Sequence, residues 1–194
     1  MTRGDPPILD RVETLAGTRP TAAAMGLWAA AEAIFLPVVP DVGLALLVLA
    51  APRRAWPLFA AVVVGAIVGT LALGIVASQD PDAVRAMLLR IPGIDAAMIA
   101  DARADLAGDG VLGFARVGIG APLKVYTAEW QALGGDSAGL IAGAILNRLT
   151  RIGPAILLAA VGGRLFAPWI RRHAGLTLVA YAAFWTLVYV IVLA

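Results

Sequence analysis

The sequence predicts an all-α, polytopic integral membrane protein with two inverted repeats. Each repeat is expected to contain a re-entrant helical hairpin and a transmembrane helix, and one extra transmembrane helix follows at the C-terminal end. The 194-residue chain is 61% hydrophobic and 14% charged, with a mean hydropathy of +0.88, which is too apolar for an ordinary soluble domain. Two of its apolar stretches are interrupted by prolines and charges. Arginine-rich and aspartate-rich segments are also well separated along the chain.

The first apolar stretch is interrupted in its middle by two carboxylates and two prolines. They are Glu32, Pro37, Pro40 and Asp41, within residues 21–51. Each proline removes a backbone donor and clashes with the preceding turn, and carboxylates are costly in hydrocarbon. The ten residues that follow Asp41 would cover about 15 Å, which is about half of a bilayer core. We therefore predict a hairpin that enters and leaves on one side.

A second interrupted stretch, residues 110–135, has the same organisation. Its break and the two flanking cations are Gly118, Gly120, Pro122, Arg116 and Lys124. About ten residues lie on each side of the break, enough to reach the middle of a membrane and return. This stretch is therefore predicted to form the second hairpin.

Two uncharged stretches are long enough to cross a bilayer as helices. Residues 55–77 and 174–194 comprise 23 and 21 residues, and about 20 are needed. Tyr181, Tyr189 and Trp185 in the second could anchor it at the membrane surface. Residues 137–163 predict a further helix, which contains Arg148, Arg151 and an internal Pro154.

The chain is thus predicted to be a single membrane domain of five parts. They are an N-terminal interfacial segment (1–20), repeat 1 (21–77), an amphipathic linker with two short helices (78–109), repeat 2 (110–163) and the C-terminal transmembrane helix (174–194). For the N-terminal segment, a short interfacial helix and a disordered tail both remain open.

The distribution of charge predicts the orientation. Eight arginines fall on one side of the traced topology: Arg3, Arg11, Arg19, Arg53, Arg54, Arg164, Arg171 and Arg172. The linker, with six aspartates and three arginines, falls on the other side. The positive-inside rule then places the N-terminus in the cytoplasm. Hairpins inserted from opposite faces are typical of inverted repeats with substrate near the midplane.

Glu32 and Asp41 are the candidate proton-coupling residues, because carboxylates at a hairpin tip inside a membrane mark ion and proton pathways. Two structural alternatives are open. Asp41 could cap the second leg of the hairpin. Glu32 could satisfy a backbone group or pair with an arginine from the opposite repeat.

Arg116, Lys124, Arg148 and Arg151 are the candidate substrate-binding residues. A cation at the centre of a membrane helix costs about 2.5 to 3.5 kcal/mol, so each one suggests an anionic partner. Cations beside the free backbone donors of a helix break suit a phosphate or carboxylate headgroup.

Each of these cations also has a structural alternative. Lys124 could extend to the membrane surface, and Arg116 could pair with Glu32 or Asp41. Arg148 and Arg151, three residues apart on one helix face, could mark a helix end at the headgroups.

Composition argues against several other classes of protein. The chain has no cysteine and a single histidine, His173, so we expect no metal and no cofactor. It carries a net charge of +2 without a basic aromatic surface, so nucleic acid is not an expected partner. The sequence has no HExxH motif, and its GxSxG and GxGxxG patterns, at residues 135–139 and 108–113, follow no predicted strand as a nucleophile elbow or a nucleotide loop would, so no enzymatic activity is expected. A homo-oligomer remains open.

The two interrupted stretches resemble those of the DedA superfamily, also called SNARE-associated or VTT-domain membrane proteins. The resemblance covers roughly residues 20–163. It rests on Glu32 with Pro37-Val38-Val39-Pro40-Asp41, on Gly65, Gly69 and Gly74, and on Phe114-Ala115-Arg116 through Gly120-Ala121-Pro122-Leu123-Lys124. Pro-Asp stands where the family usually has proline, glycine and glutamate, which makes the chain similar to the short, divergent branches.

This resemblance implies lipid handling in the bacterial inner membrane: translocation of undecaprenyl phosphate or a related carrier, or phospholipid scrambling, with proton coupling in some members. We therefore expect a flippase or scramblase that binds membrane lipids through an anionic headgroup. Two rivals are a proton-coupled exporter of a small ion or drug and a non-transporting, membrane-organising protein whose charges are only structural pairs.

Overall fold

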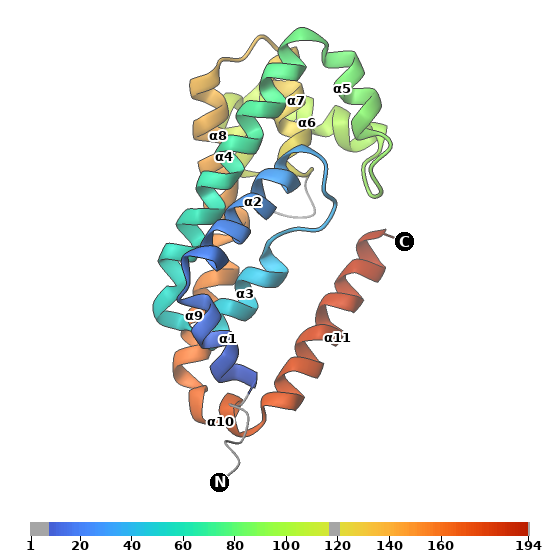
Figure 1. The fold of residues 1–194 in the computed structure, drawn as a ribbon. Helices are drawn as coiled ribbons and strands as arrows, with labels where there is room; N and C mark the ends of the chain where they lie inside the picture. The colour runs from blue at the N-terminus through green and yellow to red at the C-terminus, as the bar shows by residue number, and fades with distance from the viewer. Residues whose placement is uncertain (1–7, 117–120, 194) are drawn as a thin grey trace.

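The computed structural model describes residues 8–116 and 121–193, and every regular element in these ranges is helical (Figure 1). The helices are α1 (Ile8–Ala16), α2 (Arg19–Ile34), α3 (Asp41–Ala50), α4 (Ala55–Gln79), α5 (Pro81–Leu88), α6 (Ala96–Asp109), α7 (Leu123–Ala132), α8 (Ser137–Arg151), α9 (Gly153–Leu165), α10 (Ala167–Arg172) and α11 (Ala174–Leu193), with short 3-10 helices η1 (Pro52–Arg54) and η2 (Gly110–Ala115). The all-α fold class is confirmed for the described residues.

Two helical segments are long and apolar enough to cross a membrane. Pro52–Gln79, which joins η1 to α4, contains an 18-residue window with a mean hydropathy of 2.5, and the 18 residues Ala174–Ile191 in α11 have 1.8. A third span results if α8 and α9 count as one bent helix. The structure is therefore compatible with a multi-pass membrane protein.

α8 and α9 are two helices where the sequence predicts one. The axes of the two helices differ in direction by 41°, and Ile152 lies between them. Pro154 lies in the first turn of α9, a position where the missing proline N–H costs nothing. In a continuous helix its ring would clash with the carbonyl of Thr150. The prediction of a single helix over residues 137–163 is therefore wrong at this point.

α2 and α4 run in the same direction and pack closely through small residues (Figure 1). A Cβ atom at Gly65 would overlap the carbonyl oxygen of Gly26, and one at Gly69 would overlap that of Ala30. α3 runs in the opposite direction, back toward the end at which α2 and α4 begin (Figure 1). The turn before α2 and the turn before α4 therefore lie at the same end of the molecule.

The second interrupted stretch has a different shape from the first. Its first leg is a six-residue 3-10 helix, η2, and only the second leg, α7, is an α-helix of ten residues. Gly110 has a φ of +58°, and a Cβ at Gly113 would lie 2.9 Å from the carbonyl oxygen of Asp105. These glycines fold η2 back tightly onto α6. The expectation of two legs of about ten residues is therefore wrong for this stretch.

The described part of the N-terminal segment, from Ile8 onward, and most of the linker are helical. α1 buries Leu9 and Ala16 and packs on α3, which favours a helix over a disordered tail. The linker forms the two predicted short helices, α5 and α6. Each has an aspartate cap: Asp80 accepts a bond from the Ala83 N–H at 2.9 Å, and Asp95 accepts one from the Met98 N–H at 2.7 Å.

α11 stands beside the break between α2 and α3 and otherwise apart from the bundle (Figure 1). The Val39 N–H donates to the Tyr189 hydroxyl at 3.1 Å, and the Tyr181 hydroxyl donates to the Val42 carbonyl. The sequence suggests both tyrosines as anchors at a membrane surface. In the structure they attach α11 to the first interrupted stretch.

Candidate functional site

The first helix break consists of residues 35–40, and side chains from three helices satisfy its backbone groups. Trp28 of α2 donates to the Val38 carbonyl at 2.9 Å, and Lys124 of α7 donates to the Leu36 carbonyl at 2.7 Å. Tyr189 of α11 accepts the bond from Val39 described above. Irregular backbone is tolerated at membrane depth only when protein covers it in this way. α2 ends at Ile34 and α3 begins at Asp41, so Pro37 and Pro40 lie between the two helices.

A cluster of three buried charges lies directly beneath this break. Glu32 of α2, Lys124 of α7 and Arg148 of α8 are each 2% exposed. Arg148 donates a hydrogen bond to Glu32, and the Lys124 ammonium lies 3.9 Å from the Glu32 carboxylate. Charges buried this deeply are retained only when they are paired. The alternative in which Glu32 pairs with an arginine of the second half is therefore confirmed, and that arginine is Arg148.

Two atoms of this region have no hydrogen-bond partner among the described residues. They are Oδ1 of Asp41 and Nε of Arg148, and both are buried. Asp41 is the first residue of α3, but its side chain does not cap the helix, since Pro40 occupies the N-cap position without a side-chain bond. Buried polar atoms usually have partners. The cluster thus has hydrogen-bonding capacity that its own residues do not use.

A cavity of about 200 Å³ opens beside these charges. Glu32 and Asp41 line it from the first half of the chain, and Lys124 and Arg151 line it from the second. Pro37, Pro122, residues 91–94 and the α11 side chains Trp185, Val188 and Tyr189 complete the wall, together with Val39. Arg151 is exposed, and the one hydrogen bond it makes to a described residue is a long one, 3.4 Å, to the Ala121 carbonyl. The cavity therefore brings together two acids and two bases that are far apart in sequence.

The structure separates Arg116 from this cavity. Its side chain is 58% exposed and forms ion pairs with Asp109 and, at 3.5 Å, with Asp105. Tyr126 donates to the same Asp105 at 3.0 Å. The alternative in which Arg116 pairs with Glu32 or Asp41 is therefore wrong, because η2 folds back onto α6 and carries Arg116 with it. Gly118 and Gly120, which are predicted to form the break, lie outside the described residues.

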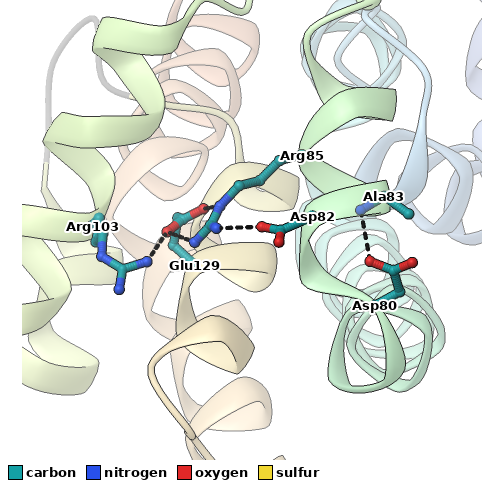
Figure 2. A network of polar contacts seen from close by, with 6 residues as sticks. All are labelled: Asp80, Asp82, Ala83, Arg85, Arg103 and Glu129. Carbon is teal, nitrogen blue, oxygen red and sulfur yellow. Dashed lines mark hydrogen bonds and ion pairs between the residues drawn. The ribbon is translucent and has the colours of Figure 1, made fainter.

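Glu129 of α7 is a second deeply buried carboxylate, and it lies in the second interrupted stretch. Its side chain is 1% exposed. Figure 2 shows Arg85 of α5 and Arg103 of α6 reaching it from either side. Arg85 donates two bonds, at 2.6 and 2.8 Å, and Arg103 donates one at 3.1 Å.

This arrangement, the Glu129 clasp, consists of Glu129, Arg85, Arg103 and Asp82. Arg85 also donates to Asp82 at 2.9 Å, and the hydrogen bonds to Glu129 raise the pKa of Arg85 above its ordinary value. The clasp fastens both linker helices to α7. The sequence pattern that singles out Glu32, an acidic residue inside an apolar stretch, applies equally to Glu129 and could have identified this arrangement.

Comparison with protein-family models, curated proteins and solved structures finds no match for this chain.

Proposed function

We propose that the protein is a membrane lipid transporter of the flippase or scramblase type, which binds the anionic headgroup of its lipid in the cavity beside the first helix break. Undecaprenyl phosphate and phospholipids are the lipid classes with the required phosphate. The observation that carries the proposal is the cavity itself, where Lys124 and Arg151 lie beside Glu32 and Asp41. Substrate sites of transporters lie at such broken helices.

Arg151 is the first contact for the headgroup in this proposal. Its guanidinium has five donors, and the described residues use one of them in a single long bond. Lys124 reaches the same cavity but already donates to the Leu36 carbonyl. A phosphate that met Arg151 could therefore recruit Lys124 as a second cation, because charge-assisted bonds to phosphate are stronger than a bond to a neutral carbonyl.

Glu32 competes with the headgroup for the same cations. It is bonded to Arg148 and lies 3.9 Å from Lys124. Protonation of Glu32 would remove its charge and release both cations for an incoming phosphate. Asp41, whose Oδ1 atom has no partner in the described part of the chain, is the second proton-accepting group at the cavity. Proton coupling would thus operate by an exchange of partners. When Glu32 takes up a proton, the phosphate replaces its carboxylate as the partner of the basic residues.

A lipid substrate also needs a lateral path to the cavity. α11 forms one wall through Trp185, Val188 and Tyr189, and it packs on little else. None of the window Ala174–Ile191 is buried. A small displacement of α11 would open the cavity toward the surrounding acyl chains without unfolding the bundle.

The proposed setting is the inner membrane of a bacterial cell, with the N-terminus in the cytoplasm. Residues 21–77 and 110–163 are proposed as inverted repeats of a short, divergent DedA-type transporter. The end that carries α1 and α10 is opposite to the end that carries α5 and α6 (Figure 1), which is compatible with the charge distribution of the sequence.

The test is transport in liposomes. A fluorescent short-chain polyprenyl phosphate is supplied in one leaflet, and its arrival in the other is followed for the parent, Arg151→Gln and Lys124→Gln. We expect each variant to be slower by about tenfold or more, because a lost charge-assisted bond is worth about 1.5 to 3 kcal/mol. Arg172→Gln is the matched control, since Arg172 is exposed and does not line the cavity. Parent-like transport by both cavity variants would contradict the proposed site.

A charge-swapped variant separates the proposal from the rival in which the charges are only structural pairs. Glu32→Arg with Arg148→Glu restores an ion pair with reversed polarity. A purely structural role predicts retained function, whereas lipid transport requires the original polarity and should be lost. An exporter of soluble cations would instead collapse an imposed pH gradient when its substrate is added, without moving lipid.

A further inference from the structure

A second and larger cavity lies at the end of the molecule that carries α1 and α10. Its volume is about 960 Å³. α1, the turn before α2, the end of α3, η1, the end of α9 and α10 surround it. None of its lining residues also lines the cavity beside the helix break. The two cavities are therefore separate sites.

Four arginines and one glutamate are the charged residues that line this cavity. They are Arg53, Arg54, Arg164, Arg171 and Glu13. Arg171 is ion-paired, since it donates to Asp10 at 2.9 Å and to Glu13 at 2.6 Å. The other three arginines have no carboxylate partner within the described ranges 8–116 and 121–193. The cavity thus concentrates positive charge that the described residues do not neutralise.

The interior of the cavity is lined by buried apolar side chains, and the helices around it are in close contact. Leu9, Ile170 and Ala51 are at most 7% exposed and form part of its lining. At Gly163 a Cβ atom would overlap the Leu49 carbonyl oxygen and lie 2.7 Å from Cγ of Pro52, so α9 contacts the end of α3 without a side chain between them. Arg54 is held near the opposite wall, where its Nη2 atom lies 3.6 Å from the position of a Cβ on Gly17.

We propose that this cavity binds the phosphate group of an amphiphile, in a site distinct from the transport cavity. Guanidinium groups offer paired donors whose geometry matches phosphate oxygens. An apolar interior beneath a rim of arginines suits a molecule with a phosphate head and a hydrophobic tail. The site depends on Arg53, Arg54 and Arg164, with Arg171 as a fourth donor that Glu13 holds in competition with the ligand.

The proposal is tested by binding to the full-length protein in a neutral detergent. Dihexanoyl phosphatidic acid and, separately, inorganic phosphate are titrated in a calorimeter, and the heat of titration into detergent alone is subtracted. We expect saturable binding of the lipid. Arg54→Gln combined with Arg164→Gln should raise its Kd by about tenfold or more, since two charge-assisted bonds are lost.

The matched control removes the same amount of charge from the same end of the molecule. Arg19 and Arg172 are exposed and do not line the cavity, so Arg19→Gln with Arg172→Gln should change the Kd by less than about twofold, as expected for screened surface charges. An equal loss of affinity in both pairs would show nonspecific attraction and overturn the site. Absence of saturable binding to the parent would also overturn it.

A third variant is expected to gain affinity. Glu13→Gln removes a carboxylate that holds Arg171, so the Kd for the lipid should fall, whereas a purely structural arginine cluster predicts no improvement. Inorganic phosphate that binds as tightly as the lipid would retain the anion site but overturn its preference for an amphiphile. Helical content and thermal midpoint are recorded for every variant to confirm folding. Because the arginines proposed to bind here differ from the cavity residues varied in the transport assay, either proposal can fail alone.

Discussion

The two deeply buried glutamates of this protein are held by arginines in different ways. Glu129 receives three hydrogen bonds from Arg85 and Arg103, whose side chains are 27% and 47% exposed. Glu32 is bonded to Arg148, which is 2% exposed, beside the equally buried Lys124. Thus the Glu129 clasp has cations that remain in contact with solvent, whereas the Glu32 cluster has cations that do not.

The two sites also differ in how many of their buried polar atoms lack a hydrogen-bond partner. Atoms of Arg148 and of neighbouring Asp41 are buried without hydrogen bonds among the described residues, and a cavity lies beside them. Both Glu129 oxygens, in contrast, accept bonds. Burial of a carboxylate is therefore not enough to identify a functional site. Spare hydrogen-bonding capacity next to an open volume distinguishes Glu32 from Glu129.

The largest expected difference between the sites is in stability. Glu32→Ala leaves Arg148 buried without its counter-charge and should cost about 3 to 5 kcal/mol. Glu129→Ala should cost only about 1 to 3 kcal/mol, because Arg85 and Arg103 can turn to solvent. Unfolding in mixed micelles with increasing dodecyl sulfate measures both values. Equal costs would remove the proposed distinction between them.

Transport should separate the two glutamates in the same order. Glu32→Gln keeps an acceptor for Arg148 but can neither carry a charge nor exchange a proton, so lipid translocation should fall by about tenfold or more. Glu129→Gln should leave translocation within about twofold of the parent, since it lies outside the proposed transport cavity. The liposome assay described above measures both rates. Parent-like transport by Glu32→Gln would contradict the role of Glu32 in transport.

Within the clasp, the two arginines are expected to contribute unequally. Arg85 makes two bonds to Glu129 and is the less exposed, so Arg85→Gln should cost about 2 kcal/mol. Arg103 makes one bond and is nearly half exposed, so Arg103→Gln should cost less than about 1 kcal/mol. Thermal unfolding of each variant gives the ranking, and the reverse order would show that Arg103 is the principal partner.

The smallest expected effect is the response to salt. Raising the ionic strength from about 0.1 to 1 M shortens the screening length from about 10 to 3 Å. The stability cost of Glu129→Gln should then shrink by up to about 0.5 kcal/mol, since its cations are partly exposed. The cost of Glu32→Gln should stay constant. Micelle unfolding at the two salt concentrations provides the measurement, and an identical response at both sites would mean that their cations are equally screened.

Much of the helical layout could be predicted from local patterns. Uncharged length predicted α4 and α11, and the prolines predicted the break between α2 and α3, because these signals depend only on nearby residues. The bend at Ile152 was missed even though Pro154 signals it. The unequal legs around η2 and α7 were also missed, because they depend on how η2 packs against α6.

The candidate site was predicted in part. Glu32, Asp41, Lys124 and Arg151 are charges in apolar stretches, and the structure brings all four to one cavity. The partner of Glu32 was not predictable, because Arg148 lies 116 residues away and meets it only because α2 and α8 both pack against α4. For the same reason the sequence could not show that Arg116 belongs with Asp109.

The sequence by itself thus determined which side chains carry charge within apolar segments and where helices must stop, since hydrophobic length and proline geometry act locally. Only the tertiary structure decided which charges meet. That choice rests on close packing at Gly65, Gly69 and Gly163, where the absence of a Cβ lets helices approach. Helix crossings set by such contacts join residues more than 80 positions apart, and no local pattern encodes them.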